Sequence, residues 1–155
     1  MRKIMGPWAA ALAGIVVALG LVMTSGSPAQ AAFRIQISEI FYNSPGPDTG
    51  SNRSLNAEWV QLHNTSGSRI TLTGWTVRDR AGHVFKFATY TLGAHSYVKI
   101  HTGKGRRSQS DRYWGLSWYV WNNNGDKATL RDNHGNEIDH CTYRDPSEIN
   151  SHKIC

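Results

Sequence analysis

The sequence predicts an all-β domain built from two packed antiparallel sheets, preceded by a segment that is not part of the fold. Two observations predict it: residues beyond 33 form many short runs of alternating apolar and polar side chains, and clusters of Gly, Asn, Asp, Ser and Pro separate these runs. Alternation with a period of two is typical of strands that bury one face. No amphipathic helix stands out there, so we expect about eight short strands in one sandwich.

The first 31 residues are predicted to be a secretory signal peptide. Arg2 and Lys3 give a positive start, residues 8–23 are mostly apolar, and residues 29–31 (AQA) have the small-x-small pattern of a signal peptidase site. The apolar run is short for a membrane span of about 20 residues; retention as an anchor is the alternative. We therefore expect one domain, residues 32–155, secreted to the extracellular space or the cell envelope.

The domain is predicted to be mildly basic. The full chain has 17 Lys and Arg against 11 Asp and Glu; Arg2 and Lys3 leave with the signal peptide, so 15 against 11 remain and the net charge is +4. This balance is compatible with an anionic partner, such as nucleic acid or an acidic envelope polymer. It is far from the dense basic stripe that marks a dedicated nucleic-acid-binding protein.

The chain has two cysteines, Cys141 and Cys155, both in the predicted domain. An even number in an exported chain favours a disulfide, with two free thiols as the alternative. The closed loop of about 15 residues would stabilise the domain by about 3 kcal/mol. We expect the bond to hold residues 144–153 against the last strand.

The expected strands follow the alternation. Shifts of parity predict a β-bulge near Ser38 and Glu39, and a bulge or a close backbone approach at Gly74. Residues 43–56 contain two Pro and two Gly and are expected to form a long loop. The expected strands are residues 34–42, 58–63, 70–79, 83–87, 96–101, 126–132 and 137–143, and the expected core includes Val60, Leu72, Trp75, Phe85 and Leu130.

Four segments carry a family pattern. Residues 56–64 (NAEWVQLHN) resemble the motif N-E-x-V-x-L-x-N, and residues 72–87 (LTGWTVRDRAGHVFKF) resemble a hairpin motif that begins L-x-G-W. Residues 101–105 (HTGKG) resemble a turn motif, and residues 121–132 (WNNNGDKATLRD) resemble the start of a strand. In this order they are similar to the lamin tail domain family. The resemblance, over residues 35–143, implies an immunoglobulin-like β-sandwich with no catalytic motif and no cofactor.

Among the seven histidines, one local cluster could hold a metal: Asp132, His134, Glu137, Asp139 and His140. It lies around a Gly-Asn hairpin, which needs polar residues in any case, so a solvated turn is the simpler interpretation. No zinc motif and no nucleophile elbow is present. We therefore predict no catalytic residue and no metal site.

The strongest candidate for ligand binding is a basic segment followed by aromatic residues. Basic groups neutralise phosphates, and aromatic rings stack on bases or on sugars. The alternative is a solvated loop beside aromatic residues of the core. The predicted ligand-binding residues are Lys104, Arg106, Arg107, Arg112, Tyr113 and Trp118.

These features predict a non-catalytic extracellular or envelope-associated binding or structural module. Alternatives are a nucleic-acid-binding accessory of an exported nuclease system, or a metal-dependent hydrolase that uses Asp132, His134 and His140. The sequence does not specify the partner, which could be an anionic envelope polymer, a protein or a nucleic acid.

Overall fold

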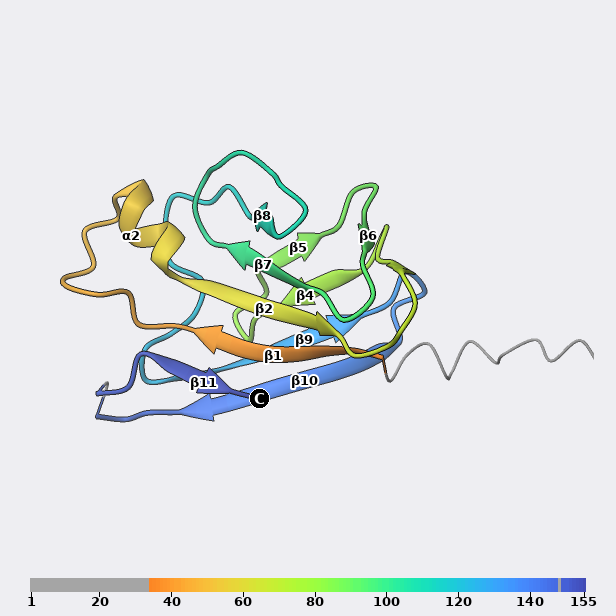
Figure 1. The fold of residues 1–155 in the computed structure, drawn as a ribbon. Helices are drawn as coiled ribbons and strands as arrows, with labels where there is room; N and C mark the ends of the chain where they lie inside the picture. Colours follow the sequence, from red (N-terminus) through yellow and green to blue (C-terminus); the bar gives the residue numbers. More distant parts are fainter. Residues whose placement is uncertain (1–33, 148) are drawn as a thin grey trace, which may run out of the picture.

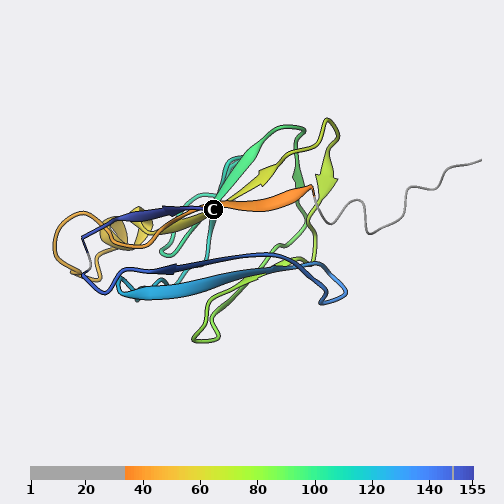
Figure 2. The same cartoon turned by 90° about the horizontal axis from the view of Figure 1, so that it is seen from below.

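The computed structural model describes residues 34–147 and 149–155, and the predicted signal peptide lies outside this part of the chain. Figures 1 and 2 show the described residues as two layers of strands with one short helix at one end. No helix in these residues is long and apolar enough to span a bilayer. The elements are β1 (Ile35–Phe41), α2 (Asn52–Ala57), β2 (Trp59–Asn64), β3 (Ile70–Thr71), β4 (Thr76–Arg78), β5 (Val84–Lys86), β6 (Thr91–Leu92), β7 (Tyr97–His101), β8 (Asp111–Tyr113), β9 (Gly125–Arg131), β10 (Glu137–Arg144) and β11 (His152–Ile154).

The two layers are a five-stranded sheet, in the order β11-β1-β2-β7-β8, and a four-stranded sheet, in the order β10-β9-β4-β5. β3 and β6 form a separate two-stranded ribbon. The strand pairs are antiparallel, apart from β7 and β8, which run parallel. This arrangement confirms the predicted sandwich.

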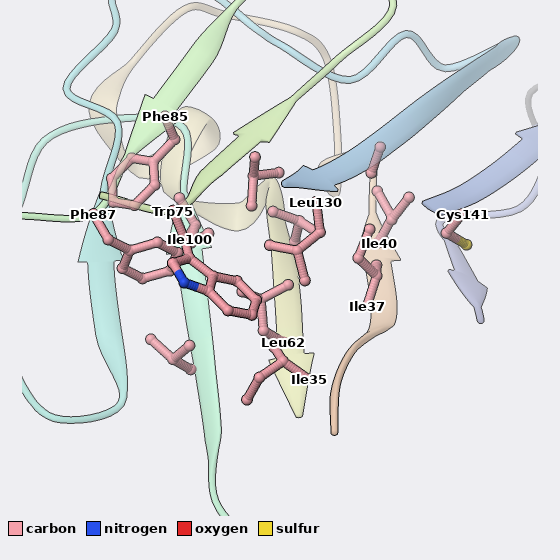
Figure 3. Packing of buried hydrophobic residues seen from close by; sticks show 14 of the residues in the cluster. Ile35, Ile37, Ile40, Leu62, Trp75, Phe85, Phe87, Ile100, Leu130 and Cys141 are labelled. Atoms are coloured by element: carbon pink, nitrogen blue, oxygen red, sulfur yellow. The ribbon is translucent and has the colours of Figure 1, made fainter. Parts of the chain in front are cut away.

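Alternation along the strands builds the core between the layers. In β2, Val60 and Leu62 are fully buried while their neighbours are partly exposed, and β9 repeats this pattern with Ala128 and Leu130. Full burial of a Val, Leu or Phe side chain contributes about 1.5–3 kcal/mol, so these positions drive the association of the sheets. Figure 3 shows side chains from both sheets meeting in one cluster. The five predicted core residues are each at most 8% exposed: Val60, Leu72, Trp75, Phe85 and Leu130.

The bulge predicted at Ser38 and Glu39 is confirmed, because the register of β1 against β2 shifts between Ile37 and Glu39. The prediction of one strand over residues 70–79 is wrong. Gly74 has φ of +84° and turns the chain, so β3 pairs with β6 while β4 pairs with β5 and β9. A side chain disfavours this conformation, which is why glycine suits the position.

The prediction that residues 43–56 form only a loop is also wrong, because α2 lies at its end. The Ser51 hydroxyl caps the helix by accepting a hydrogen bond from the Ser54 N–H, and Leu55 anchors it in the interior. A six-residue helix with a single buried position has no periodicity that the sequence could reveal.

The disulfide between Cys141 and Cys155 is confirmed, with 5.8 Å between its Cα atoms. The position of the tail differs from the prediction: β11 pairs with β1, on the opposite sheet from β10. Just beyond β11, the Cys155 N–H donates to the Ser38 carbonyl, at 3.0 Å. Because Cys141 belongs to β10, the bond joins the two layers.

Candidate functional site

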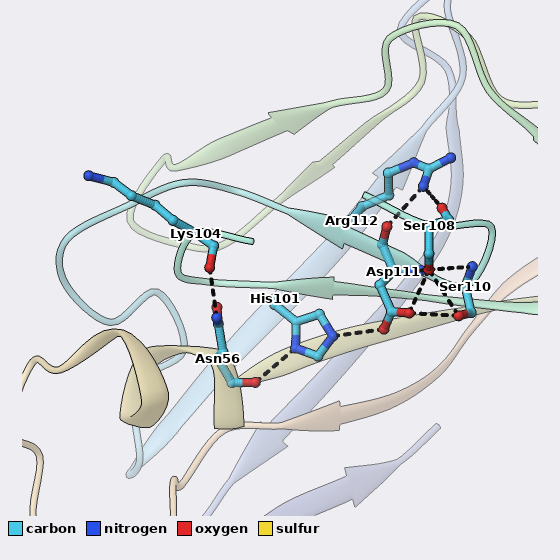
Figure 4. Close-up of polar contacts among 7 residues, drawn as sticks. All are labelled: Asn56, His101, Lys104, Ser108, Ser110, Asp111 and Arg112. Atoms are coloured by element: carbon cyan, nitrogen blue, oxygen red, sulfur yellow. Dashed lines mark hydrogen bonds and ion pairs between the residues drawn. The ribbon is translucent and has the colours of Figure 1, made fainter. Parts of the chain in front are cut away.

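The predicted basic segment lies in the loop between β7 and β8, residues 102–110, here called the basic loop. Its first part is fastened to α2: the Asn52 side chain donates to the Lys104 carbonyl at 2.9 Å and accepts from the Lys104 N–H at 2.7 Å. The Asn56 amide also donates to the Lys104 carbonyl, at 2.9 Å. Figure 4 shows the Lys104 side chain extending away from these contacts. The helix that the sequence did not reveal therefore shapes the loop.

A polar network fixes the other end of the loop. The ring nitrogens of His101 lie 2.8 Å from the Asn56 carbonyl and 3.1 Å from Asp111 Oδ1 (Figure 4). Asp111 Oδ2 accepts hydrogen bonds from the hydroxyls of Ser110, at 2.6 Å, and Ser108, at 2.7 Å. These two hydrogen bonds lower the pKa of Asp111 to about 2. The ionised carboxylate thus holds the loop where it joins β8.

Arg112 is held in a defined position. Its Nη1 donates to the carbonyls of Ser108 and Asp111, and its guanidinium lies over the Tyr90 ring, 3.9 Å from the centroid. Burial lowers the pKa of Arg112, and the nearby positive charge of Arg107 lowers it too. Both hydrogen bonds engage Nη1, and a guanidinium carries further N–H donors on Nη2 and Nε. A cation fixed in this way can bind an anion with little loss of side-chain freedom.

These elements enclose a pocket of about 330 Å³ between β5, the segment that follows it and the basic loop, here called the basic pocket. Three cationic side chains line it, and no Asp or Glu does. Among the described residues, none of the three takes part in an ion pair. The residues that define it are Lys86, Thr89, Tyr90, Arg107, Gln109 and Arg112.

The structure thus brings together only part of the predicted ligand-binding set. Arg107 and Arg112 line the basic pocket, whereas Arg106 is exposed beside it and Lys104 lines a separate hollow with Leu116 and Ser117. Figure 4 shows Lys104 and Arg112 at opposite ends of the group of side chains drawn.

The two aromatic residues of the predicted set lie elsewhere. The Tyr113 ring stacks on His101, with centroids 5.1 Å apart, on the five-stranded sheet. Trp118 is 64% exposed, contacts Tyr119 at its edge and lies next to Gly50. Gly105 sits so close to the Tyr113 ring that a Cβ atom at this position would overlap it. Tyr113 therefore supports the basic loop rather than facing the basic pocket.

Sequence reasoning missed Lys86 and Tyr90. Both belong to the hairpin region around β5, far along the chain from the basic loop, and nothing local shows which loop they face. The alternation of buried Phe85 and Phe87 did imply that Lys86 is exposed, and that was the only signal available.

Glu58 is a second unusual group, and it lies outside the basic pocket. It is fully buried, and Oε1 accepts hydrogen bonds from the Thr102 hydroxyl at 2.6 Å and the Val120 N–H at 2.8 Å. Burial raises the pKa of Glu58 to about 7, against the lowering effect of these hydrogen bonds. The carboxyl group ties the end of β7 to the segment before β9.

The carboxylates and histidines of residues 132–140 have separate partners. Asp132 accepts from the N–H groups of His134 and Asn136, both at 2.9 Å, while His140 pairs with Glu137 at 3.0 Å. Asp139 instead accepts from the Ile37 N–H of the opposite sheet, at 2.8 Å. In the part of the chain that the structure describes, no three His, Cys, Asp or Glu side chains are grouped to hold a metal ion.

Comparison with known proteins agrees with the fold. No curated protein matches the chain. The family model described as Lamin Tail Domain matches residues 28–145, well over half of the sequence. This is a family of immunoglobulin-like, non-enzymatic domains, and the order of strands described above is consistent with it. The chain therefore belongs to the lamin tail domain family.

Proposed function

We propose that this protein is a secreted, non-catalytic binding module that binds an anionic group of a cell-envelope polymer in its basic pocket. The observation that carries the proposal is the set of Lys86, Arg107 and Arg112 around one pocket without a lining carboxylate. Arginine and lysine bind phosphate and carboxylate groups by charge-assisted hydrogen bonds. An anionic ligand would supply the negative charge that no Asp or Glu side chain supplies in the lining of the basic pocket.

The sequence supports secretion of the protein through its apolar start and its small residues at 29–31. The disulfide that joins the two layers is in keeping with an oxidising compartment. Detection of the processed protein outside the cell, with Ala32 at its N-terminus, would test this part.

Two neighbouring arginines provide a matched test of the pocket. Arg107 lines it and Arg106 does not, although both are exposed and lie in the same loop. We expect Arg107→Glu to lose retention on immobilised anionic envelope polymer, and Arg106→Glu to keep most of it. Equal losses in both variants would mean that the polymer responds only to overall charge, and the pocket assignment would then be wrong.

A further inference from the structure

A second hollow, of about 440 Å³, adjoins the basic pocket and shares Gln109 with it. Its other lining residues come from the ends of β6 and β7, from the chain before β3 and from the end of the basic loop. They include Arg69, Thr91, Ser96, Tyr97 and Ser110.

The walls of the two hollows follow one another along the chain. On one side, Thr89 and Tyr90 line the basic pocket and Thr91 lines the second hollow. On the other side, Ser108 lines the basic pocket, Gln109 both, and Ser110 the second hollow. The two hollows therefore adjoin, and between them the Tyr90 hydroxyl of one wall donates a hydrogen bond to the Gln109 carbonyl of the other, at 2.6 Å. The surface formed by both hollows is called the anion groove below.

The second hollow is also lined by positive charge, with one cationic side chain against three in the basic pocket. Arg69 is exposed there and, among the described residues, forms no ion pair. No Asp or Glu lines the second hollow. Asp111, the nearest carboxylate in sequence, does not line either hollow, and its Oδ2 accepts hydrogen bonds from Ser108 and Ser110, which do. Each hollow thus has at least one cation, three in the basic pocket and Arg69 in the second hollow, as binding of a chain with successive negative charges requires.

The rings along the anion groove are not placed for stacking on bases. Phe85 and Tyr90 are at most 8% exposed, and the Tyr90 ring packs on Phe87 and Arg112. Tyr97 is 47% exposed, but its ring is stacked on His63, with centroids 4.0 Å apart. Proteins that bind single-stranded nucleic acid present aromatic faces to successive bases, and this groove offers at most one.

We propose that the anion groove binds a linear chain of phosphodiester-linked polyol units, with one phosphate in the basic pocket and a later one beside Arg69. This inference rests on the proposed function, because it names the polymer that the basic pocket binds. Arginine guanidinium groups match phosphate geometry, and a groove with at most one available ring face favours a chain without bases.

The first experiment separates the two hollows with purified protein and two probes, glycerol 1-phosphate and poly(glycerol phosphate), by calorimetry. We expect Arg107→Gln to weaken both probes. Arg69→Gln should weaken only the polymer, about fivefold, as the loss of one exposed charge contact allows. Arg53→Gln, a change in α2 that lines neither hollow, is the matched control and should leave both affinities unchanged.

The outcomes distinguish the two proposals. If Arg107→Gln changes neither probe, the basic pocket is not the binding site and the proposed function fails. If Arg107→Gln weakens both probes but Arg69→Gln leaves the polymer unchanged, the basic pocket stands and the assignment of the anion groove is wrong. Salt titration supplies a second readout, because removal of one phosphate contact from a flexible chain reduces the slope of log affinity against log salt by about 0.7.

The second experiment tests the exclusion of bases. Poly(glycerol phosphate) and oligothymidylate with the same number of phosphates are compared at one salt concentration. We expect the polyol chain to bind at least as tightly as the oligonucleotide. Tighter binding of oligothymidylate, weakened by Tyr97→Ala, would overturn the polyol assignment in favour of single-stranded nucleic acid.

Discussion

Glu58 and the cations of the basic pocket are all ionisable groups, but the fold uses them in opposite ways. Glu58 is fully buried and accepts hydrogen bonds from Thr102 and Val120. Lys86 and Arg107 are exposed, and within the described residues they form no ion pair. The difference teaches that an ionisable group enclosed by hydrogen-bond partners supports the structure, whereas a charge exposed in a hollow is available to a ligand.

The largest expected effect on stability comes from removal of the buried Glu58 carboxyl group. Glu58→Ala leaves the Thr102 hydroxyl and the Val120 N–H without their acceptor and opens a cavity. We expect the free energy of unfolding to fall by about 4 kcal/mol, as for other lost buried polar partners. Urea denaturation measures it; a loss below about 1 kcal/mol would show that solvent satisfies these donors.

Removal of the disulfide should be the next largest effect. The double substitution Cys141→Ser and Cys155→Ser removes the covalent link between β11 and β10. We expect the free energy of unfolding to fall by about 3 kcal/mol, because the unfolded chain without the disulfide has a higher conformational entropy. Thermal unfolding with and without reductant checks this. Polymer binding below the melting temperature should be unchanged, since neither cysteine lines the anion groove.

The titration of Glu58 predicts a comparable change with pH. Because its pKa is raised to about 7 in the folded protein from 4.5, the folded state holds a proton that the unfolded state releases. Stability therefore falls as pH rises from 4.5 to 7, by about 3 kcal/mol in total. Glu58→Gln cannot titrate, so the difference between wild type and variant isolates this slope. A difference that is independent of pH would contradict the raised pKa.

The smallest expected effect on stability comes from the exposed cations of the basic pocket. Lys86→Gln with Arg107→Gln removes two exposed charges without a protein partner. We expect the free energy of unfolding to change by no more than about 0.5 kcal/mol, although retention on the polymer is lost. A clear destabilisation would mean that these cations support the basic loop, and the contrast with Glu58 would then disappear.

Alternation along single strands was enough to predict the sandwich. Val60 and Leu62 of β2 show why: burial of every second side chain is a local property, and so is the parity shift at Ser38. The disulfide was also predictable, because two cysteines allow only one pairing. The partner of β11 was not, since pairing with β1 depends on the whole chain.

The basic pocket could be predicted only in part. The run of cations from Lys104 to Arg112 is visible in the sequence, but contacts with residues distant in sequence decide which of these side chains line the basic pocket. Asn52 holds Lys104 on the α2 side, and Tyr90 draws Arg112 to the other side. Lys86 arrives from a distant hairpin, so no local pattern could include it.

The hydrogen bond from the Ile37 N–H to Asp139 also bears on which strand edges are open to pairing with another chain. Together with β11, it covers the outer margin of β1, which would otherwise present open backbone groups to another polypeptide. Copies of the domain at high concentration can then lie close together without this strand starting intermolecular β-pairing.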